Sequence, residues 1–479
     1  MAERIHRRFR NILGTSALAL CLAGVAALAD TLFTATSDGF IGSVSAGGAE
    51  RGAPVHAGDT AVITGTGLVP GQAITLMRGT TVLNPDGPIT VDAEGGFSHE
   101  LTVDGEALTG LQPIVVIGEN PAAATVAELK VSPDLPVSGD DLFTAQSGPV
   151  TRGLYQVAYS AGADALYVTS AVGRPPVRDS ELLRLDPETL EVQAEATPVE
   201  APAAPGRQPA PADGDDRPGV FAVYGVDVDE ANGNVWVTNT RQNTVAVYKQ
   251  DDLSLVRQYD PGAVSHARDV IVNETLGRAY ASATGTGNIE VFDTATLEQL
   301  EPIVIRSAQR GGEFSVMSLA LDEESGKLVT VSLSSPEAAV VDLASGEARI
   351  IPIPGAKSAS GVAYDPVDGL IFVASQATDN LLIVSEESGE ILHDIETGAG
   401  ALNVTFEPQG RLAYVSNRGA GTVTVVNTSG EIVANLDGGS LPNHLNADGK
   451  GNVFAVNKSR GEDDAEGDRI WRITPVAAE

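Results

Sequence analysis

The chain has 479 residues, of which 64 are Asp or Glu and 30 are Lys or Arg, so its formal charge is −34 at pH 7. Such an acidic surface repels polyanions at long range and argues against a protein that coats nucleic acid in bulk, although it allows a local basic patch. The single cysteine is Cys21, so the chain beyond it has no disulfide, no thiolate nucleophile and no cysteine ligand for a metal.

Residues 1–29 have the three-part layout of a secretory signal. Four arginines precede the apolar run ILGTSALALCLAGVAALA, which ends in a small-residue triplet before Asp30. A retained membrane anchor is the alternative, and it is disfavoured because the run is short and is followed by a cleavage triplet. No later segment is apolar for long enough to span a membrane. We therefore expect an exported, periplasmic protein, with secretion or cell-surface display as alternatives.

Residues 30–131 are predicted to form a small β-sandwich. Short alternating strands are separated by Gly-Thr-Gly, Pro-Gly, Asp-Gly and Gly-Gly at intervals of roughly ten residues. The order GTGLVPGQAITL, VDAEGGFSHELTV, a valine-rich strand and VAELKV resembles the bacterial immunoglobulin-like modules of exported proteins. This resemblance implies a spacer or an adhesive unit, and no residue here suggests catalysis. Residues 132–140 contain two prolines and are predicted to be a linker.

A five-residue phrase recurs seven times in the rest of the chain. The copies are LYVTS, VWVTN, AYASA, LVTVS, IFVAS, AYVSN and VFAVN, beginning at residues 166, 235, 279, 328, 371, 413 and 453. Their spacings lie between 40 and 49 residues except for the first, of 69, which contains a Pro/Ala/Asp-rich insertion that we expect to be a disordered loop. A period near 40 residues indicates a propeller or a solenoid.

Each copy lies in the same predicted setting of four strands. A strand and an acidic turn such as DPVDG (365–369) precede the phrase; a polar loop, an alternating strand such as TVTVV (422–426) and an outer strand such as IVANL (432–436) follow it. Four-stranded units repeated around an axis are propeller blades, and no segment shows a sustained helical stripe. We predict an all-β chain, a seven-bladed β-propeller preceded by the sandwich.

The chain from residue 152 to residue 474 resembles the YVTN-repeat propellers, most closely the periplasmic YncE-like group. The resemblance is carried by GLYQVAYS, LYVTS, LLRLDPETLEV and LPNHLNADGKGNVFAVNKS, the last followed by an acidic loop and DRIWRI. It implies an exported, non-enzymatic propeller that binds a partner on one face, single-stranded DNA among the candidates. Because propellers host many unrelated activities, the fold by itself does not select a function.

Near-identical hexapeptides, LFTATS at 32–37 and LFTAQS at 142–147, lie at the start of the predicted sandwich and just before the first repeat. The last repeat lacks an outer strand, because the chain ends at Glu479 soon after DRIWRITP. An unclosed ring would leave open strand edges. We predict that residues 141–148 supply the missing strand and close a propeller that spans residues 141–475. Competition by the first copy for the same position is the alternative.

Charges are predicted to separate between the two ends of the propeller. Connections between blades and loops between second and third strands emerge on one face, where basic residues with aromatic and amide neighbours lie near the axis; turns on the other face are mainly acidic. The predicted ligand-binding residues of this central mouth are Arg152, Tyr155, Tyr224, Arg241, His266, Arg268, Arg310, Phe314, Lys357, Arg418, Asn443, His444 and Lys458. They favour an anionic peptide, polymer or single-stranded nucleic acid. The alternative is that they balance acids in the same loops.

No catalytic residue, metal site or cofactor is predicted. His266 and His444 are able to converge on the axis and hold a metal, but ordinary loop histidines are the simpler interpretation. The glycine-rich strings lack a phosphate-loop lysine, and no Gly-x-Ser-x-Gly elbow occurs. The loops DVDEANG (227–233) and NADGKGN (446–452) depart from the calcium-loop pattern and fall where each blade needs a turn.

The sequence thus favours a monomer that binds an anionic ligand or a protein partner, and not an enzyme. A propeller lactonase would need a central ring of carboxylates and metal-binding amides. The sequence offers only Asn403 and Asn443 for such a ring, which is too few. A quinone-dependent dehydrogenase would need tryptophan-rich repeats, whereas the chain has only Trp236 and Trp471. A surface adhesion protein is the third alternative, because of the sandwich.

Overall fold

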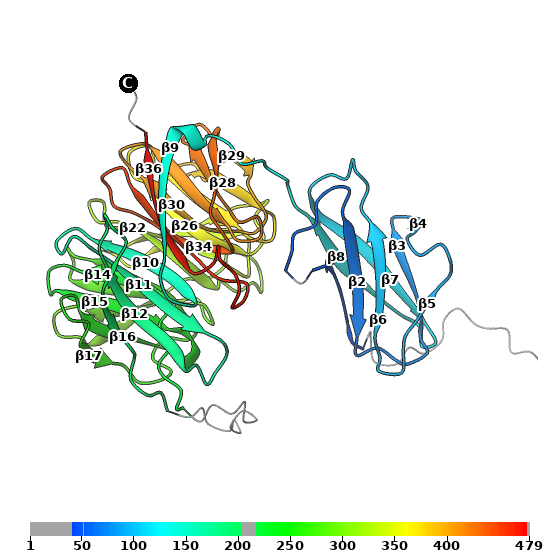
Figure 1. The fold of residues 1–479 in the computed structure, drawn as a ribbon, viewed down its shortest axis with the longest axis horizontal. Helices are drawn as coiled ribbons and strands as arrows, with labels where there is room; N and C mark the ends of the chain where they lie inside the picture. Colours follow the sequence, from blue (N-terminus) through cyan, green and yellow to red (C-terminus); the bar gives the residue numbers. More distant parts are fainter. Residues whose placement is uncertain (1–40, 51, 203–216, 477–479) are drawn as a thin grey trace, which may run out of the picture.

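Strands make up nearly all of the regular structure. The computed structural model describes residues 41–50, 52–202 and 217–476, and its only helical turns are the 3₁₀ segments η1 (Asp140–Leu142) and η2 (Thr240–Gln242). Within these ranges no helix has the length and apolar character needed to cross a bilayer. The predicted signal and the first hexapeptide copy lie outside the described residues. The strands form two bodies joined by the linker (Figure 1).

The smaller body is a two-sheet β-sandwich. One sheet has the order β1-β2-β6; the other has the order β4-β3-β7-β8, with β5 paired to β3. The strands are β1 (Ser43–Gly48), β2 (Thr60–Thr66), β3 (Ala73–Arg78), β4 (Thr81–Val82), β5 (Ile89–Thr90), β6 (Phe97–Thr102), β7 (Gly110–Glu119) and β8 (Ala123–Val131). Alternate residues such as Ile63, Leu76 and Val116 are fully buried between the sheets. That the sandwich is immunoglobulin-like stays a prediction.

The larger body consists, over the described residues, of seven four-stranded antiparallel sheets around an axis. Blades 1 to 3 are β10 (Leu154–Ser160), β11 (Ala165–Val172), β12 (Asp179–Leu185), β13 (Val192–Ala196); β14 (Val226–Asp229), β15 (Asn234–Asn239), β16 (Thr244–Lys249), β17 (Leu255–Gln258); β18 (Ala267–Asn273), β19 (Arg278–Ala283), β20 (Asn288–Asp293), β21 (Gln299–Val304). Blades 4 and 5 are β22 (Val316–Asp322), β23 (Lys327–Ser332), β24 (Glu337–Asp342), β25 (Ala348–Pro352); β26 (Ala359–Asp365), β27 (Leu370–Ser375), β28 (Asn380–Ser385), β29 (Ile391–Glu396). Blades 6 and 7 are β30 (Ala401–Glu407), β31 (Leu412–Asn417), β32 (Thr422–Asn427), β33 (Ile432–Asp437); β34 (Pro442–Ala447), β35 (Val453–Asn457), β36 (Arg469–Pro475) and β9 (Phe143–Pro149).

The first strands of successive blades contact one another in a closed circle, from β10 through β14, β18, β22, β26 and β30 to β34 and back to β10. This arrangement confirms the prediction of an all-β propeller. We call the end that carries the connections between blades the mouth face, and the opposite end the far face.

The recurring phrase forms the second strand of every blade. Nearly all of its residues are buried, because both faces of a blade pack against the neighbouring blades. Trp236, Phe372 and Tyr414 in these strands are fully buried. Burial on both sides explains why the phrase is a nearly continuous apolar run, whereas buried and exposed residues alternate in the outer strands.

The outer strand of the last blade comes from the segment before the first blade. β9 pairs antiparallel with β36, from Phe143 opposite Pro475 to Pro149 opposite Arg469. Phe143 is 7% exposed, and its ring centroid lies 6.2 Å from that of Tyr414 in blade 6. Since β9 also leads directly into blade 1, this strand joins the two ends of the ring.

Carboxylates on the far face hold neighbouring blades together. Glu274 accepts hydrogen bonds from the amides of Glu230 at 2.6 Å and Ala231 at 3.1 Å, and Glu323 accepts one from the amide of Glu274 at 2.8 Å. The acidic turns of this face therefore satisfy backbone donors of the adjoining blade.

Candidate functional site

Four cations from four blades come together on the mouth face. They are Arg241 between β15 and β16, Arg268 in β18, Arg418 between β31 and β32, and Lys458 directly after β35. Burial, followed by the charges of Arg418, Arg268 and Arg241, lowers the pKa of Lys458 to about 7. Each of the three arginines thus lies close enough to oppose a positive charge on Lys458. We call these four residues the mouth cluster.

Two tyrosines lie beside the mouth cluster. The rings of Tyr155 and Tyr224 are nearly perpendicular, with centroids 4.4 Å apart, which is a favourable edge-to-face arrangement. The Nζ atom of Lys458 lies 3.3 Å from the ring centroid of Tyr155. Tyr224 is 3% exposed, and burial raises its pKa to about 12. Little ring surface is left on which a nucleic-acid base is able to stack.

An amide positions Arg418. The Arg418 guanidinium donates a hydrogen bond to Asn443 Oδ1, while Asn443 Nδ2 donates one to the carbonyl oxygen of Tyr155 at 2.6 Å. Burial, with a further contribution from Arg268, lowers the pKa of Arg418 below its ordinary value. Asn443 therefore ties a cation of blade 6 to the backbone of blade 1.

The mouth cluster concentrates positive charge on the mouth face. In the described part of the chain, none of its four members lies within ion-pair distance of a carboxylate, whereas nine ion pairs form elsewhere. Partly buried, unpaired cations are costly, and an anion at this position would relieve that cost. The local charge is opposite to that of the whole chain, −34.

The two predicted mouth histidines lie at different depths. His266 is exposed at the rim with φ +49°, and loss of solvent around its ring, with the charges of Arg241 and Arg268, lowers its pKa. His444 lines the axis: its Nδ1 accepts a hydrogen bond from the Val157 amide at 3.4 Å, and burial lowers its pKa to about 3, so the ring is neutral. Among the residues described, no three His, Cys, Asp or Glu side chains are placed to hold a metal.

Four of the other predicted site residues have different surroundings. Arg152 is exposed and lies 3.4 Å from Glu462, and Arg310 is exposed between β21 and β22. Phe314 is 3% exposed within the apolar core, so its ring is not available to a ligand. Lys357 pairs with a carboxylate of the sandwich at 2.5 Å. Position in the repeat predicts the face of a loop but not the direction of its side chains.

A polar cavity of about 210 Å³ lies on the axis and is lined by the first strands. Asp227 and Asp269 border it, and each accepts a backbone hydrogen bond, from Val272 at 2.7 Å and Leu319 at 3.0 Å respectively. Burial raises the pKa of both carboxyl groups, that of Asp227 to about 7. Asp227 is therefore partly protonated near neutral pH.

The raised pKa of Asp227 predicts that stability falls as the pH rises. In the unfolded chain an aspartate titrates near about pH 3.9. The stability contributed by the protonated Asp227 carboxyl group is therefore fully present below about pH 4 and is lost as the pH rises through 7. We expect the Asp227→Asn variant to be more stable than the wild type at pH 8 by about 1–2 kcal/mol, less than the full linkage because water reaches the cavity. Thermal melts at pH 5 and pH 8 measure this difference; equal pH dependence in the two proteins would contradict it.

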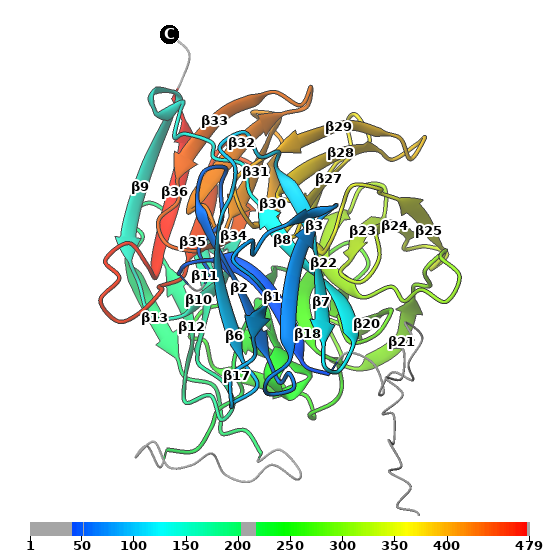
Figure 2. The ribbon, with the colours of Figure 1, turned by 90° about the vertical axis from the view of Figure 1, so that its right-hand side faces the viewer.

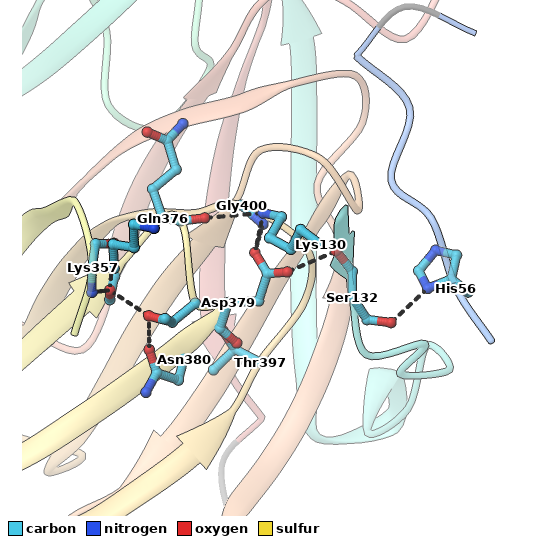
Figure 3. Close-up of polar contacts among 11 residues, drawn as sticks. His56, Lys130, Ser132, Lys357, Gln376, Asp379, Asn380, Thr397 and Gly400 are labelled. Atoms are coloured by element: carbon cyan, nitrogen blue, oxygen red, sulfur yellow. Dashed lines mark hydrogen bonds and ion pairs between the residues drawn. The ribbon is translucent and has the colours of Figure 1, made fainter. Parts of the chain in front are cut away.

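The sandwich lies over the mouth face, in front of the ring of blades in Figure 2. Asp379, between β27 and β28 of blade 5, joins the two bodies. Its carboxylate accepts hydrogen bonds from Lys130 Nζ at 2.7 Å, from Ser132 Oγ at 2.7 Å and from the Gly400 amide at 2.6 Å (Figure 3). The Asp379 side chain is 2% exposed, so this contact is shielded from solvent.

A cavity of about 870 Å³ lies between the sandwich and the mouth face; we call it the chamber. Ala46 and Thr64 are among the sandwich residues that line it, and Gly400 and Arg418 are among those of the propeller. Arg418 therefore belongs both to the mouth cluster and to the chamber wall. The volume is in the range of ordinary ligand pockets.

Known proteins resemble the chain in sequence only weakly. No family model matches it. It is 24% identical over 342 residues to the uncharacterized protein YncE of Salmonella typhimurium, a match that covers 68% of this chain and 89% of the relative. The YncE protein of Salmonella typhi matches with the same identity and coverage.

Solved structures match the larger body. Virginiamycin B lyase from Staphylococcus aureus superposes with a TM-score of 0.51 and 14% identity, over 70% of this chain and 100% of the lyase. A catalytically inactive form of that lyase with quinupristin superposes with a TM-score of 0.52 and 13% identity, with the same coverage. The chain is a β-propeller with weak sequence similarity to the YncE proteins. At these identities the lyase structures establish the fold of this propeller and nothing about its chemistry.

The contact between the propeller and the sandwich is a feature that the sequence did not predict. Lys130 lies in an ordinary alternating strand, and Asp379 lies in a polar loop of the kind every blade has. Only their proximity in three dimensions makes them a buried ion pair. No local signal in the sequence distinguishes these two residues from other exposed charges.

Proposed function

We propose that this YncE-like propeller is exported and binds an anionic ligand on its mouth face, beneath the sandwich. The observation that carries this proposal is the convergence of Arg241, Arg268, Arg418 and Lys458 without a carboxylate partner among the described residues. Cations collected in this way in a strongly acidic protein raise the local concentration of anions.

Carboxylate or phosphate groups are the ligand chemistry that fits best. Guanidinium groups bind both in a fixed fork geometry, and the chamber next to Arg418 has space for an extended molecule. Stacking of bases is disfavoured, because Tyr224 is buried and Lys458 lies over Tyr155. An acidic peptide or polymer is therefore favoured over single-stranded DNA. The sandwich, as a wall of the chamber, would then serve binding rather than adhesion.

Catalysis is the second candidate function. The observation in its favour is Lys458, because a partly buried lysine with a pKa near 7 beside other cations has the properties of a reactive amine.

Replacing Arg241, Arg268 and Arg418 together by alanine is expected to weaken binding of a polyglutamate peptide by about 100-fold or more. Each hydrogen bond to a charged group contributes about 1.5–3 kcal/mol, and each 1.4 kcal/mol corresponds to a tenfold change in affinity. Titration by calorimetry at low and at physiological salt measures the loss, and an oligothymidylate of equal charge tests the nucleic-acid alternative.

The matched control replaces Arg257, Arg306 and Arg349, which are exposed elsewhere on the propeller, and so removes the same charge. This variant should bind within a few-fold of the wild type. An equal loss in both triple variants would mean that only net charge matters, and unchanged binding in the mouth variant would exclude the site. Tighter binding of the oligothymidylate would favour nucleic acid as the ligand.

A further inference from the structure

Lys458 differs from every other lysine of the chain. The chain has six lysines; the other five are Lys130, Lys249, Lys327, Lys357 and Lys450. Three of these five pair with carboxylates, and the remaining two donate to neutral side-chain oxygens at 3.0 and 2.8 Å. The Nζ atom of Lys458 instead lies against a tyrosine ring, 3.3 Å from its centroid. Its amine is left without a polar acceptor among the described contacts.

A small cavity gives access to Lys458. It measures about 180 Å³, lies between the last and the first blade, and is lined by Lys458, Arg152, Ser459 and Asp468. The carboxylate of Asp468 is engaged by the backbone, because its Oδ1 accepts hydrogen bonds from the amides of Gly153 at 2.8 Å and Ser459 at 3.1 Å. Lys458 is therefore part of a cavity wall, next to the Tyr155 ring on which its amine lies.

The groups around Lys458 favour the neutral amine. Arg418, Arg268 and Arg241 face it from three other blades and oppose a further positive charge, whereas Asp468 favours the ammonium form. The balance, dominated by burial, lowers the pKa of Lys458 to about 7. A lysine that is desolvated and lies next to other cations is a nucleophile at neutral pH.

We propose that Lys458 forms an imine with the carbonyl carbon of a small anionic aldehyde or keto acid, which the positive charge of the mouth-cluster arginines attracts to it. The neutral Nζ attacks the carbonyl carbon, protons pass from nitrogen to the carbonyl oxygen, and water leaves as the C=N bond forms. No oxidant or reductant is consumed. This inference deepens the proposed function and rests on it, because the arginines select an anionic carbonyl compound.

Reductive trapping tests the proposal. The full chain is treated at pH 7 with glyoxylate and cyanoborohydride, which converts an imine into a stable carboxymethyl amine, and labelled lysines are located by peptide mass mapping. We expect Lys458 to be labelled at least about tenfold faster than any other lysine, because an ordinary lysine is neutral in fewer than about one molecule in a thousand at this pH. Its labelling rate should rise with pH around a midpoint near 7. Lys458→Arg should abolish this label, and Lys450→Arg should leave it unchanged.

Acetaldehyde, an uncharged probe, separates the two proposals. Preferential labelling of Lys458 by glyoxylate supports both the imine and anion binding by the arginines, provided that inorganic phosphate and the Arg268→Ala substitution each make this labelling slower. Equal labelling by both aldehydes, insensitive to phosphate, would support the reactive amine and contradict anion binding by the arginines. Binding of polyglutamate without preferential labelling of Lys458 would overturn the imine proposal and leave the proposed function standing. Labelling of all six lysines at similar rates would overturn it as well.

Discussion

Replacing residues 141–148 by a Gly/Ser segment of equal length is expected to lower the melting temperature of the propeller by about 5 °C or more. The replacement removes the ladder between β9 and β36 and the buried ring of Phe143, whose loss alone typically costs about 3–5 kcal/mol. It also exposes the edge of β36 and breaks the link by which the first blade holds the last. Calorimetry and hydrogen exchange of blade 7 measure these effects.

The matched control replaces the outer strand of blade 1, β13 (Val192–Ala196), in the same way. Both variants lose one outer strand, but only the first loses the strand that joins the two ends of the ring. The control should therefore have the smaller decrease in melting temperature. Equal decreases would mean that β9 contributes only as an outer strand, and no decrease in either would contradict its role in closure.

Asp379→Ala is expected to release the sandwich from the mouth face. The substitution removes the acceptor of the Gly400 amide and the carboxylate that pairs with Lys130, whose ammonium keeps only its hydrogen bond to the Gln376 carbonyl at 3.1 Å. Breaking a fully buried pair costs about 3–5 kcal/mol, and we expect about 2–3 kcal/mol here because the Lys130 side chain is 30% exposed. The equilibrium between docked and free sandwich should shift by roughly 30- to 140-fold, since 1.4 kcal/mol is tenfold.

Small-angle scattering should show a larger radius of gyration for this variant, and hydrogen exchange should increase at Gly400. Both bodies have cores of their own, so each should stay folded. Glu128→Ala is the matched control, since it removes a carboxylate from the same interface. Its pair with Lys357 is about half exposed on both sides, so the loss should be small. Indistinguishable scattering for Asp379→Ala and wild type would show that the contact does not hold the sandwich.

Much of the fold was predictable because it recurs. The second strand of a blade is buried on both faces, so every copy of the phrase is apolar along its length and is recognisable without an alignment. The need for an outer strand in the last blade follows from counting strands, and β9 occupies that position. The immunoglobulin-like character of the sandwich and the export signal stay predictions.

The site was predictable only in part. The face on which a loop emerges follows from its place in the repeat. Arg241, Arg418 and Lys458 were predicted to lie on the mouth face for this reason. The direction of a side chain depends on how its loop packs, so Phe314 lies in the core and Lys357 binds the sandwich instead. Whether these residues bind a ligand is a proposal that the arginine and lysine experiments test.

The sequence by itself determined the repeat, its period and therefore which loops share the mouth face, because these features depend on residues close together along the chain. The tertiary structure alone decided which charges are paired. Lys130 and Asp379 are 249 residues apart yet form a shielded ion pair, while Lys458 lies among arginines of three other blades without one. Burial and electrostatic energy depend on distance in space rather than in sequence, and they make one lysine part of an interface and the other a candidate nucleophile.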